Sequence, residues 1–87
     1  MVNMNKKQQK TLSRLKDKPT RADISWNEVQ SFFKAIGAQV RQDEGSRIQV
    51  ILNTRVLRLH KPHPQKDLKK YAVEAIRDFL INVEGIK

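Results

Sequence analysis

The chain has 87 residues, of which 38% are hydrophobic, and it contains no cysteine. This length suits one small domain with a single core, and no run approaches the roughly 18–20 apolar residues of a membrane span. Without cysteine, disulfides and thiolate metal sites are excluded, which fits a reducing, cytoplasmic setting. The formal net charge of +9 favours a polyanionic partner, usually nucleic acid.

The N-terminal segment carries most of this charge. Residues 1–21 hold seven bases and one acid, a net charge of +6. Residues 1–7 are predicted to be disordered and residues 8–16 to form a short helix, with Leu12 and Leu15 as its apolar contacts and Pro19 beyond its end. Such a short helix depends on tertiary packing. We therefore expect residues 1–22 to be a basic, partly disordered arm and residues 23–87 to be the folded domain.

Residues 24–37, "ISWNEVQSFFKAIG", predict the clearest helix. Ser25 and Glu28 have the spacing of a capping box, and Ile24 and Val29 that of a hydrophobic staple. Gly37 can take the left-handed conformation that ends a helix. Apolar residues at helical spacing indicate one buried face, formed by Trp26, Val29, Phe32, Phe33 and Ile36.

The hydrophobic period then changes from helical to alternating. Strands are predicted over residues 38–43, 46–52 and 55–60, with turns at residues 43–45, which contain Gly45, and at residues 53–54. In the second strand Ile48, Val50 and Leu52 share one face. In the third strand Leu57 and Leu59 do the same. The pattern predicts a three-stranded antiparallel meander.

Two prolines make residues 61–67 a loop, and a last helix is predicted over residues 67–84, ended by Gly85. Its expected buried stripe is Leu68, Tyr71, Ala72, Ala75, Ile76, Phe79, Leu80 and Val83. The predicted class is α+β, in the order α-β-β-β-α. Both helices are expected on one face of the sheet, so that all apolar faces are buried together.

The other sheet face then stays open to solvent. It is predicted to carry side chains that are basic or hydrogen-bonding: Arg41, Arg47, Gln49, Arg58 and His60. A three-stranded sheet with helices on one side is also the architecture of double-stranded-RNA-binding domains.

The stretch "RLHKPHPQKDLKK" (residues 58–70) contains both histidines of the chain, His60 and His63, followed by three lysines. A histidine titrates near neutral pH and can exchange protons with a ribose hydroxyl and a leaving oxygen, while lysines near a helix N-terminus can hold phosphate. Two histidines alone do not complete a zinc site, and although Asp67 could be a third ligand, the lysine-rich surroundings suit phosphate better than a metal. We therefore predict no metal and no cofactor.

These motifs resemble those of the HicA family, the toxin half of a bacterial toxin–antitoxin pair. "GSRIQV" begins with the family's Gly-Ser, "HKPHPQKDLKK" contains its Pro-His-Pro and lysine-rich turn, and Gly85 fits its end. The resemblance covers about residues 24–86. It implies a fold similar to the double-stranded-RNA-binding domain, an mRNA-cleaving or mRNA-binding activity that blocks translation, and neutralisation by a HicB-type antitoxin. An oligomer with that antitoxin is compatible with the resemblance.

The sequence departs from the family at one important position. The family's functional histidine follows Gly-Ser, where this chain has Arg47. Arginine keeps its proton at physiological pH and cannot act as a general base, although it can hold a phosphate. Either the acid–base role has moved to His60 or His63, with His60 favoured because it shares a face with Arg47, or the protein binds RNA without cutting it.

The candidate catalytic residues are Arg47, His60 and His63. The candidate RNA-binding residues are Arg41, Ser46, Gln49, Arg58, Lys61, Lys66, Lys69 and Lys70. Two other interpretations remain: a pure interaction module, whose basic face docks an acidic protein, and a DNA-binding regulator. The second lacks a helix-turn-helix pair, since a sheet separates the two clear helices.

Overall fold

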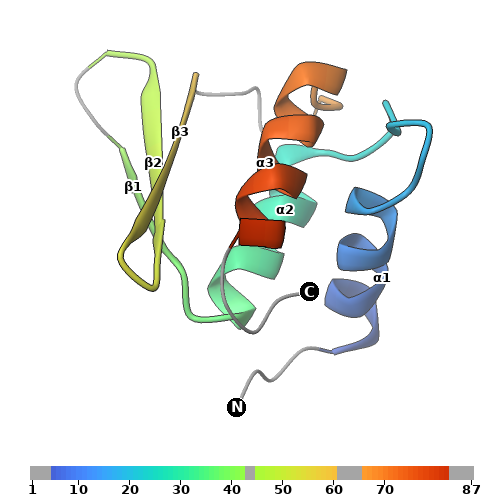
Figure 1. Ribbon diagram of the computed structural model, residues 1–87, viewed down its shortest axis with the longest axis horizontal. Helices are drawn as coiled ribbons and strands as arrows, with labels where there is room; N and C mark the ends of the chain where they lie inside the picture. The colour runs from blue at the N-terminus through green and yellow to red at the C-terminus, as the bar shows by residue number, and fades with distance from the viewer. Residues whose placement is uncertain (1–4, 43–44, 61–65, 83–87) are drawn as a thin grey trace.

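The computed structural model describes residues 5–42, 45–60 and 66–82 (Figure 1). Its elements, in chain order, are α1 (Lys6–Leu15), α2 (Trp26–Ala35), β1 (Gln39–Gln42), β2 (Arg47–Leu52), β3 (Arg55–His60) and α3 (Lys70–Asn82). From α2 onward the order is helix, three strands and helix. This confirms the predicted α+β class.

The three strands form one antiparallel sheet in the order β1-β2-β3. On its inner face Val50 of β2 lies opposite both Val40 of β1 and Leu57 of β3. Asn53 and Thr54 connect β2 to β3 with φ angles of 50° and 67°, the left-handed pair that suits a two-residue hairpin. The predicted meander is confirmed.

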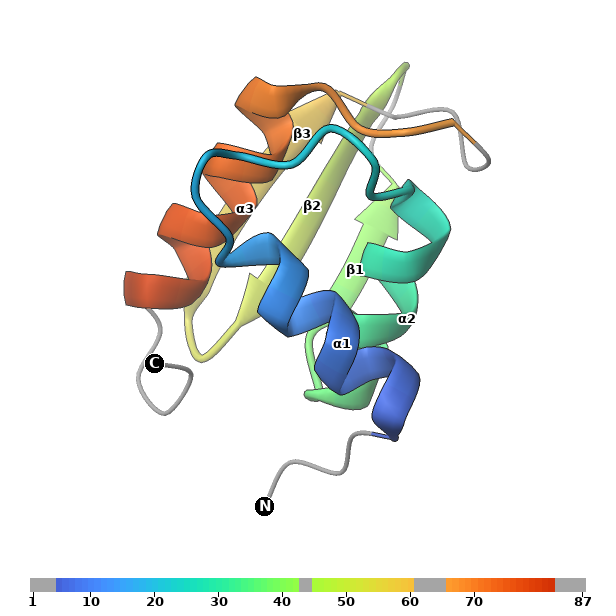
Figure 2. The same cartoon turned by 90° about the vertical axis from the view of Figure 1, so that its right-hand side faces the viewer.

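The helices form two further layers on one side of this sheet. Helix α2 contacts β1 and helix α3 contacts β3, so both cover the same sheet face, as predicted (Figure 1). Helix α1 contacts α2 and α3 from the side away from the sheet (Figures 1 and 2). The opposite sheet face is not covered by any element that the structure describes.

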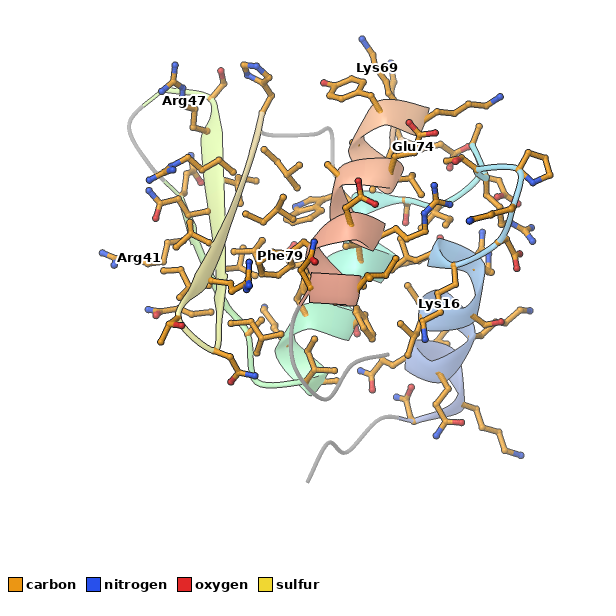
Figure 3. All side chains as sticks on the ribbon, in the orientation of Figure 1. Lys16, Arg41, Arg47, Lys69, Glu74 and Phe79 are labelled. Atoms are coloured by element: carbon orange, nitrogen blue, oxygen red, sulfur yellow. The ribbon has the colours of Figure 1, made fainter. Side chains whose placement is uncertain are left out.

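The hydrophobic core fills the space between the sheet and α2 and α3, and it extends to α1. Its largest fully buried side chains are Phe32, Phe33, Leu15, Ile24, Ile76, Leu80, Val29, Val50 and Val73. Phe79 lies between α3 and the sheet (Figure 3), where its ring meets Phe33 edge-on at a centroid distance of 6.3 Å. Burial of each such side chain contributes about 1.5–3 kcal/mol.

Helix α2 has the ends that its sequence predicts. The Ser25 side chain accepts a hydrogen bond from the Glu28 backbone N–H, and the Glu28 carboxylate accepts one from the Ser25 backbone N–H. This is the predicted capping box. Gly37 has a φ of +85°, which is the left-handed conformation that a glycine tolerates at a helix end.

Helix α1 begins earlier than predicted. The expectation of disorder over residues 1–7 is wrong for residues 5–7, because Asn5 caps the helix in a capping box with Gln8. Leu15 is fully buried and Thr11 is 4% exposed, while Leu12 is partly buried against the core. The rest of the stretch expected to be disordered, residues 1–4, lies outside the described residues.

Helix α3 begins at Lys70, later than predicted, and is rotated relative to the expected stripe. Tyr71 is 59% exposed, whereas Val73 is fully buried, so the assignment of Tyr71 to the core is wrong. The reason is geometric: five residues before Ile76, at 3.6 residues per turn, Tyr71 is rotated by about 140° from the centre of the stripe. Val83 and Gly85 lie outside the described residues.

Polar contacts fasten the connection between α1 and α2 to the helices. The Arg77 guanidinium donates to the Asp17 carbonyl (3.1 Å) and to the Thr20 hydroxyl (3.3 Å), and that hydroxyl donates to the Glu74 carboxylate (2.9 Å). Arg14 pairs with Glu28 on α2. Among the described helices, none combines the length and the apolar character needed to cross a bilayer.

Candidate nucleic-acid interface

The outer face of the sheet carries a row of polar side chains across all three strands. Arg41 of β1 lies opposite Gln49 of β2, which lies opposite Arg58 of β3. Because neighbouring strands are about 4.8 Å apart, the row places one guanidinium group on each side of the Gln49 amide. Arg41 projects away from the helices, into solvent (Figure 3). The predicted open face is therefore present.

A second row begins at the end of the sheet that lies near the start of α3. Arg47, the first residue of β2, is paired with His60, the last residue of β3, and both are exposed. In Figure 3 Arg47 and Lys69 lie at the same end of the molecule. The predicted neighbourhood of Arg47 and His60 is thus observed. A guanidinium group and an imidazole thus occupy adjacent positions on one exposed surface.

A pocket of about 470 Å³ lies between β3 and the beginning of α3. Arg58 and His60 belong to the outer sheet face and also line the pocket, which lies beside the edge strand β3. The remaining side chains that line it are Leu59, Lys66, Asp67, Leu68, Lys69, Tyr71, Ala72 and Ala75. The basic surface of the sheet therefore continues into a hollow that is lined in part by apolar side chains.

Contacts with α2 hold the start of α3 in place beside the pocket. The Leu68 backbone N–H donates to the Ile24 carbonyl at 2.7 Å, and Ser25 and Asp67 form an isolated antiparallel bridge. Leu68 is 4% exposed and anchors the segment in the core. The α2 cap and the pocket wall are therefore parts of one structure, which positions Lys66 and Lys69.

Ion pairs among the described residues gather on the helical side of the molecule, away from this interface. Arg14 pairs with Asp23 and Glu28, and Arg21 pairs with Asp17 and Asp23. The hydrogen bonds from Arg21 hold the pKa of the Asp23 carboxyl well below its usual range. Carboxylates thus neutralise arginine side chains near α1. Among the residues that the structure describes, no salt bridge involves the arginines of the outer sheet face.

The Glu28 carboxyl belongs to the same helical network. Its partial burial raises its pKa, but the hydrogen bonds from Ser25 and the charge of Arg14 outweigh this effect, so that the pKa is lowered overall. The ionised carboxylate is therefore the form that the folded protein favours. It supports both the α2 cap and the attachment of α1.

The structure brings together most of the residues predicted for the site, in two groups. Arg41, Arg47, Gln49, Arg58 and His60 share the outer sheet face, and Ser46 is exposed beside Arg47. Arg58, His60, Lys66 and Lys69 line the pocket. Lys70 is exposed at the start of α3 but does not line the pocket. Lys61 and His63 lie outside the described residues.

Sequence reasoning missed the aromatic residue of the pocket, Tyr71. Its position at helical spacing from Leu68 and Ala75 suggested the core, yet it is also five residues from Ile76 and therefore faces away from the stripe. The spacing of Val73, Ile76 and Leu80 along the helix could have revealed the exposure of Tyr71, because these three residues define the buried face of α3. Asp67 and the apolar residues that line the pocket were likewise not assigned to the site.

The fold and the site define an α+β domain with a basic outer sheet face that adjoins a pocket lined in part by apolar side chains. Residues 26–82, well over half of the chain, match the family model described as the HicA toxin of bacterial toxin–antitoxin. The chain therefore belongs to the HicA toxin family, as its motifs predicted. Comparison with curated proteins and with solved structures gives no significant match. Toxins of this family pair with an antitoxin, so a partner of that kind is expected.

Proposed function

We propose that this protein is a toxin that binds RNA, mRNA above all, and thereby blocks translation in the cytoplasm. The observation that carries the proposal is the continuous basic surface from Arg41 across Gln49 to Arg58 and into the pocket. Guanidinium groups recognise phosphate oxygens with paired hydrogen bonds. Of the remaining predicted contacts, Lys66, Lys69 and Lys70 extend this surface toward the start of α3, and Ser46 is exposed beside Arg47. Lys61 stays a predicted contact.

A second activity, endoribonuclease cleavage without a metal, is favoured by His60, which lies opposite Arg47 at the mouth of the pocket. In this proposal His60 accepts the proton of a ribose 2′-hydroxyl. The 2′-oxygen attacks the adjacent phosphorus, the bond from phosphorus to the 5′-oxygen breaks, and a 2′,3′-cyclic phosphate remains. The departing oxygen takes up a proton, for which His63 is the candidate donor. Arg47 holds the phosphate and stabilises its developing charge.

The proposed protein partner is a HicB-type antitoxin that neutralises the toxin, with assembly into an oligomer as a further expectation. The alternative is a protein-binding module, in which the basic face serves to dock an acidic partner and RNA is incidental. Both functions use the same surface, so mutation of the surface alone does not separate them. Affinity for naked RNA does, because a pure docking module has no need of it.

The strand β3 offers a matched pair of variants for this test. Arg55 and Arg58 are both exposed, but Arg55 lies opposite the buried Leu52, whereas Arg58 lies in the outer row. Arg58→Ala is expected to weaken RNA binding roughly three- to fivefold at low salt, the effect of losing one exposed charge contact. Arg55→Ala changes the net charge equally and is expected to bind as the wild type does. Equal loss in both variants, or no RNA binding by the wild type, would contradict the proposal.

A further inference from the structure

The side chain of Tyr71 is exposed and does not contribute to the hydrophobic core. At 59% it is the most exposed large hydrophobic side chain among the described residues. It lies on the side of α3 away from the centre of the buried stripe, so packing of the core does not require it. It does line the pocket beside β3. An exposed aromatic ring at a pocket is a typical feature of a binding site.

The side chains that line this pocket are mainly of two kinds, apolar and cationic. Leu59, Leu68, Ala72 and Ala75 supply the apolar lining, and the ring of Tyr71 adds a flat aromatic surface. Arg58, Lys66 and Lys69 supply three positive charges against the one carboxylate of Asp67, and His60 adds a hydrogen-bonding ring. A nucleotide likewise has two parts, a planar base and an anionic phosphate. The volume of about 470 Å³ is within the range of pockets for small ligands.

We propose that this pocket binds one unpaired nucleotide of an RNA chain. The nucleobase stacks on the ring of Tyr71, and the phosphate is held by the basic side chains that line the pocket. The inference rests on the proposed RNA-binding function and specifies the state of the RNA. Bases of an A-form duplex are stacked inside the helix, and proteins recognise such a duplex by its shape and backbone. An unpaired base can leave the strand and stack on an aromatic ring. The protein should therefore prefer single-stranded RNA, although the sheet and helix order alone suggested a duplex binder.

The test compares three ligands of equal length: a short oligouridylate, the same ribose-phosphate chain without bases, and a perfectly paired RNA duplex. Binding of each is measured by fluorescence anisotropy for the wild type, Tyr71→Ala, Tyr71→Leu and Tyr71→Phe. The control is Ile81→Ala, because Ile81 is similarly exposed, at 51%, on the same helix but does not line the pocket. Circular dichroism and thermal unfolding verify that each variant is folded.

The wild type is expected to bind oligouridylate more tightly than either other ligand. Tyr71→Ala and Tyr71→Leu should lose about 5- to 150-fold in affinity for oligouridylate, the range for one base stacked on one aromatic ring. Their affinities for the chain without bases and for the duplex should stay near those of the wild type. Tyr71→Phe keeps the ring and should bind normally, as should Ile81→Ala.

Three outcomes would overturn the nucleotide pocket while leaving RNA binding intact. They are equal wild-type affinities for oligouridylate and duplex, unchanged binding by Tyr71→Ala and Tyr71→Leu, and an equal loss of affinity by these variants for all three ligands. The last outcome would mean that Tyr71 only supports the fold of the pocket. If the wild type binds none of the three ligands, the proposed RNA-binding function itself is wrong.

Discussion

Arg47 and His60 occupy paired positions on β2 and β3, and of these two kinds of side chain only an imidazole can serve as a general base. The two side chains are therefore suited to different steps of phosphate chemistry. The arginine can hold an anion in every state of the reaction, whereas the histidine can act at the moment of proton transfer. This division makes separate predictions for the two residues.

His60→Ala is expected to reduce the rate of RNA cleavage by about 10²–10⁴, the usual effect of removing a general acid or base. Its RNA affinity should change much less. Arg47→Ala should weaken binding and rate together, because a phosphate contact serves ground and transition states alike. A time course on labelled RNA, run with a chelator present to exclude a metal route, measures both effects.

Two further variants extend this experiment. His63→Ala should reduce the rate less than His60→Ala, because solvent water can also protonate the leaving oxygen, and Arg47→His should raise the rate because it restores a titratable group at the family position. If His60→Ala cuts as fast as the wild type, the assignment of proton transfer to His60 is wrong. If the wild type binds RNA but cuts no faster than a boiled sample, the protein is an RNA-binding toxin without nuclease activity.

Glu28 makes a prediction about pH, because folding lowers the pKa of its carboxyl. The contribution of Glu28 to stability is therefore complete above the unfolded-state pKa and is lost as the pH falls toward the folded-state value. Glu28→Gln should lower the free energy of unfolding by about 1 kcal/mol at neutral pH, a typical cost for a weakened helix cap. The difference from the wild type should shrink in acid. Urea unfolding at neutral and acidic pH measures it, and a constant difference would contradict the assignment.

At the scale of elements, local patterns predicted the strands and α2 well. Alternating apolar and polar residues identified β2 and β3, because one face of the sheet is buried and the other is open to solvent. Successive side chains of a strand point to opposite faces, so the position of a residue along the strand predicts its face. The turn at residues 53–54 and the end at Gly37 followed from conformations that few residues favour. The start of α1 was missed because its first turn, residues 6–9, contains no apolar residue and therefore shows no helical hydrophobic period. The helix begins there because Asn5 and Gln8 form a capping box.

The role of α1 also depends on information that the local sequence does not contain. Its apolar contacts are few, and only the arrangement of α2 and α3 shows the surface that receives Leu15 and Thr11. The division of the chain into an arm, residues 1–22, and a domain, residues 23–87, remains a prediction. The family match, which begins at residue 26, is compatible with it.

Deletion of residues 1–10 tests this division. It removes the Asn5 cap and the exposed Lys6, Lys7 and Lys10, but leaves Leu15 and all of α2, α3 and the sheet. We expect the truncated protein to keep a cooperative fold with a lower melting temperature, because a shortened α1 packs less well. RNA binding at low salt should also weaken, since the positive charges of three lysine side chains are lost.

The charge effect and the packing effect of this deletion can be separated. Replacement of Lys6, Lys7 and Lys10 together by glutamine keeps the helix and removes the charge. This variant should reproduce the loss of RNA affinity without the loss of thermal stability. A truncated protein that fails to fold would show that the domain is not independent of α1, and an unchanged melting temperature would show that α1 contributes nothing to stability.

At the scale of the whole molecule, positive charge is not spread evenly. The described ion pairs lie near α1, while Arg41, Arg47 and Arg58 face solvent on the opposite side, on the outer sheet face. Sequence alternation predicted this face correctly. The pocket could not be predicted, because it requires the edge of β3 and the start of α3 to meet in space, and that meeting depends on the contact between Leu68 and Ile24.

The dependence of RNA affinity on salt concentration tests the central claim most directly, since neutralised phosphates release counterions in proportion to their number. With a short single-stranded RNA, the logarithm of the association constant should fall against the logarithm of salt concentration with a slope of at least about 3. A variant with both Arg41→Ala and Arg58→Ala should have a slope smaller by roughly 1.4, at about 0.7 per lost contact. Lys16→Ala, on the helical side of the molecule (Figure 3), should leave the slope unchanged. A flat salt response of the wild type would contradict the account.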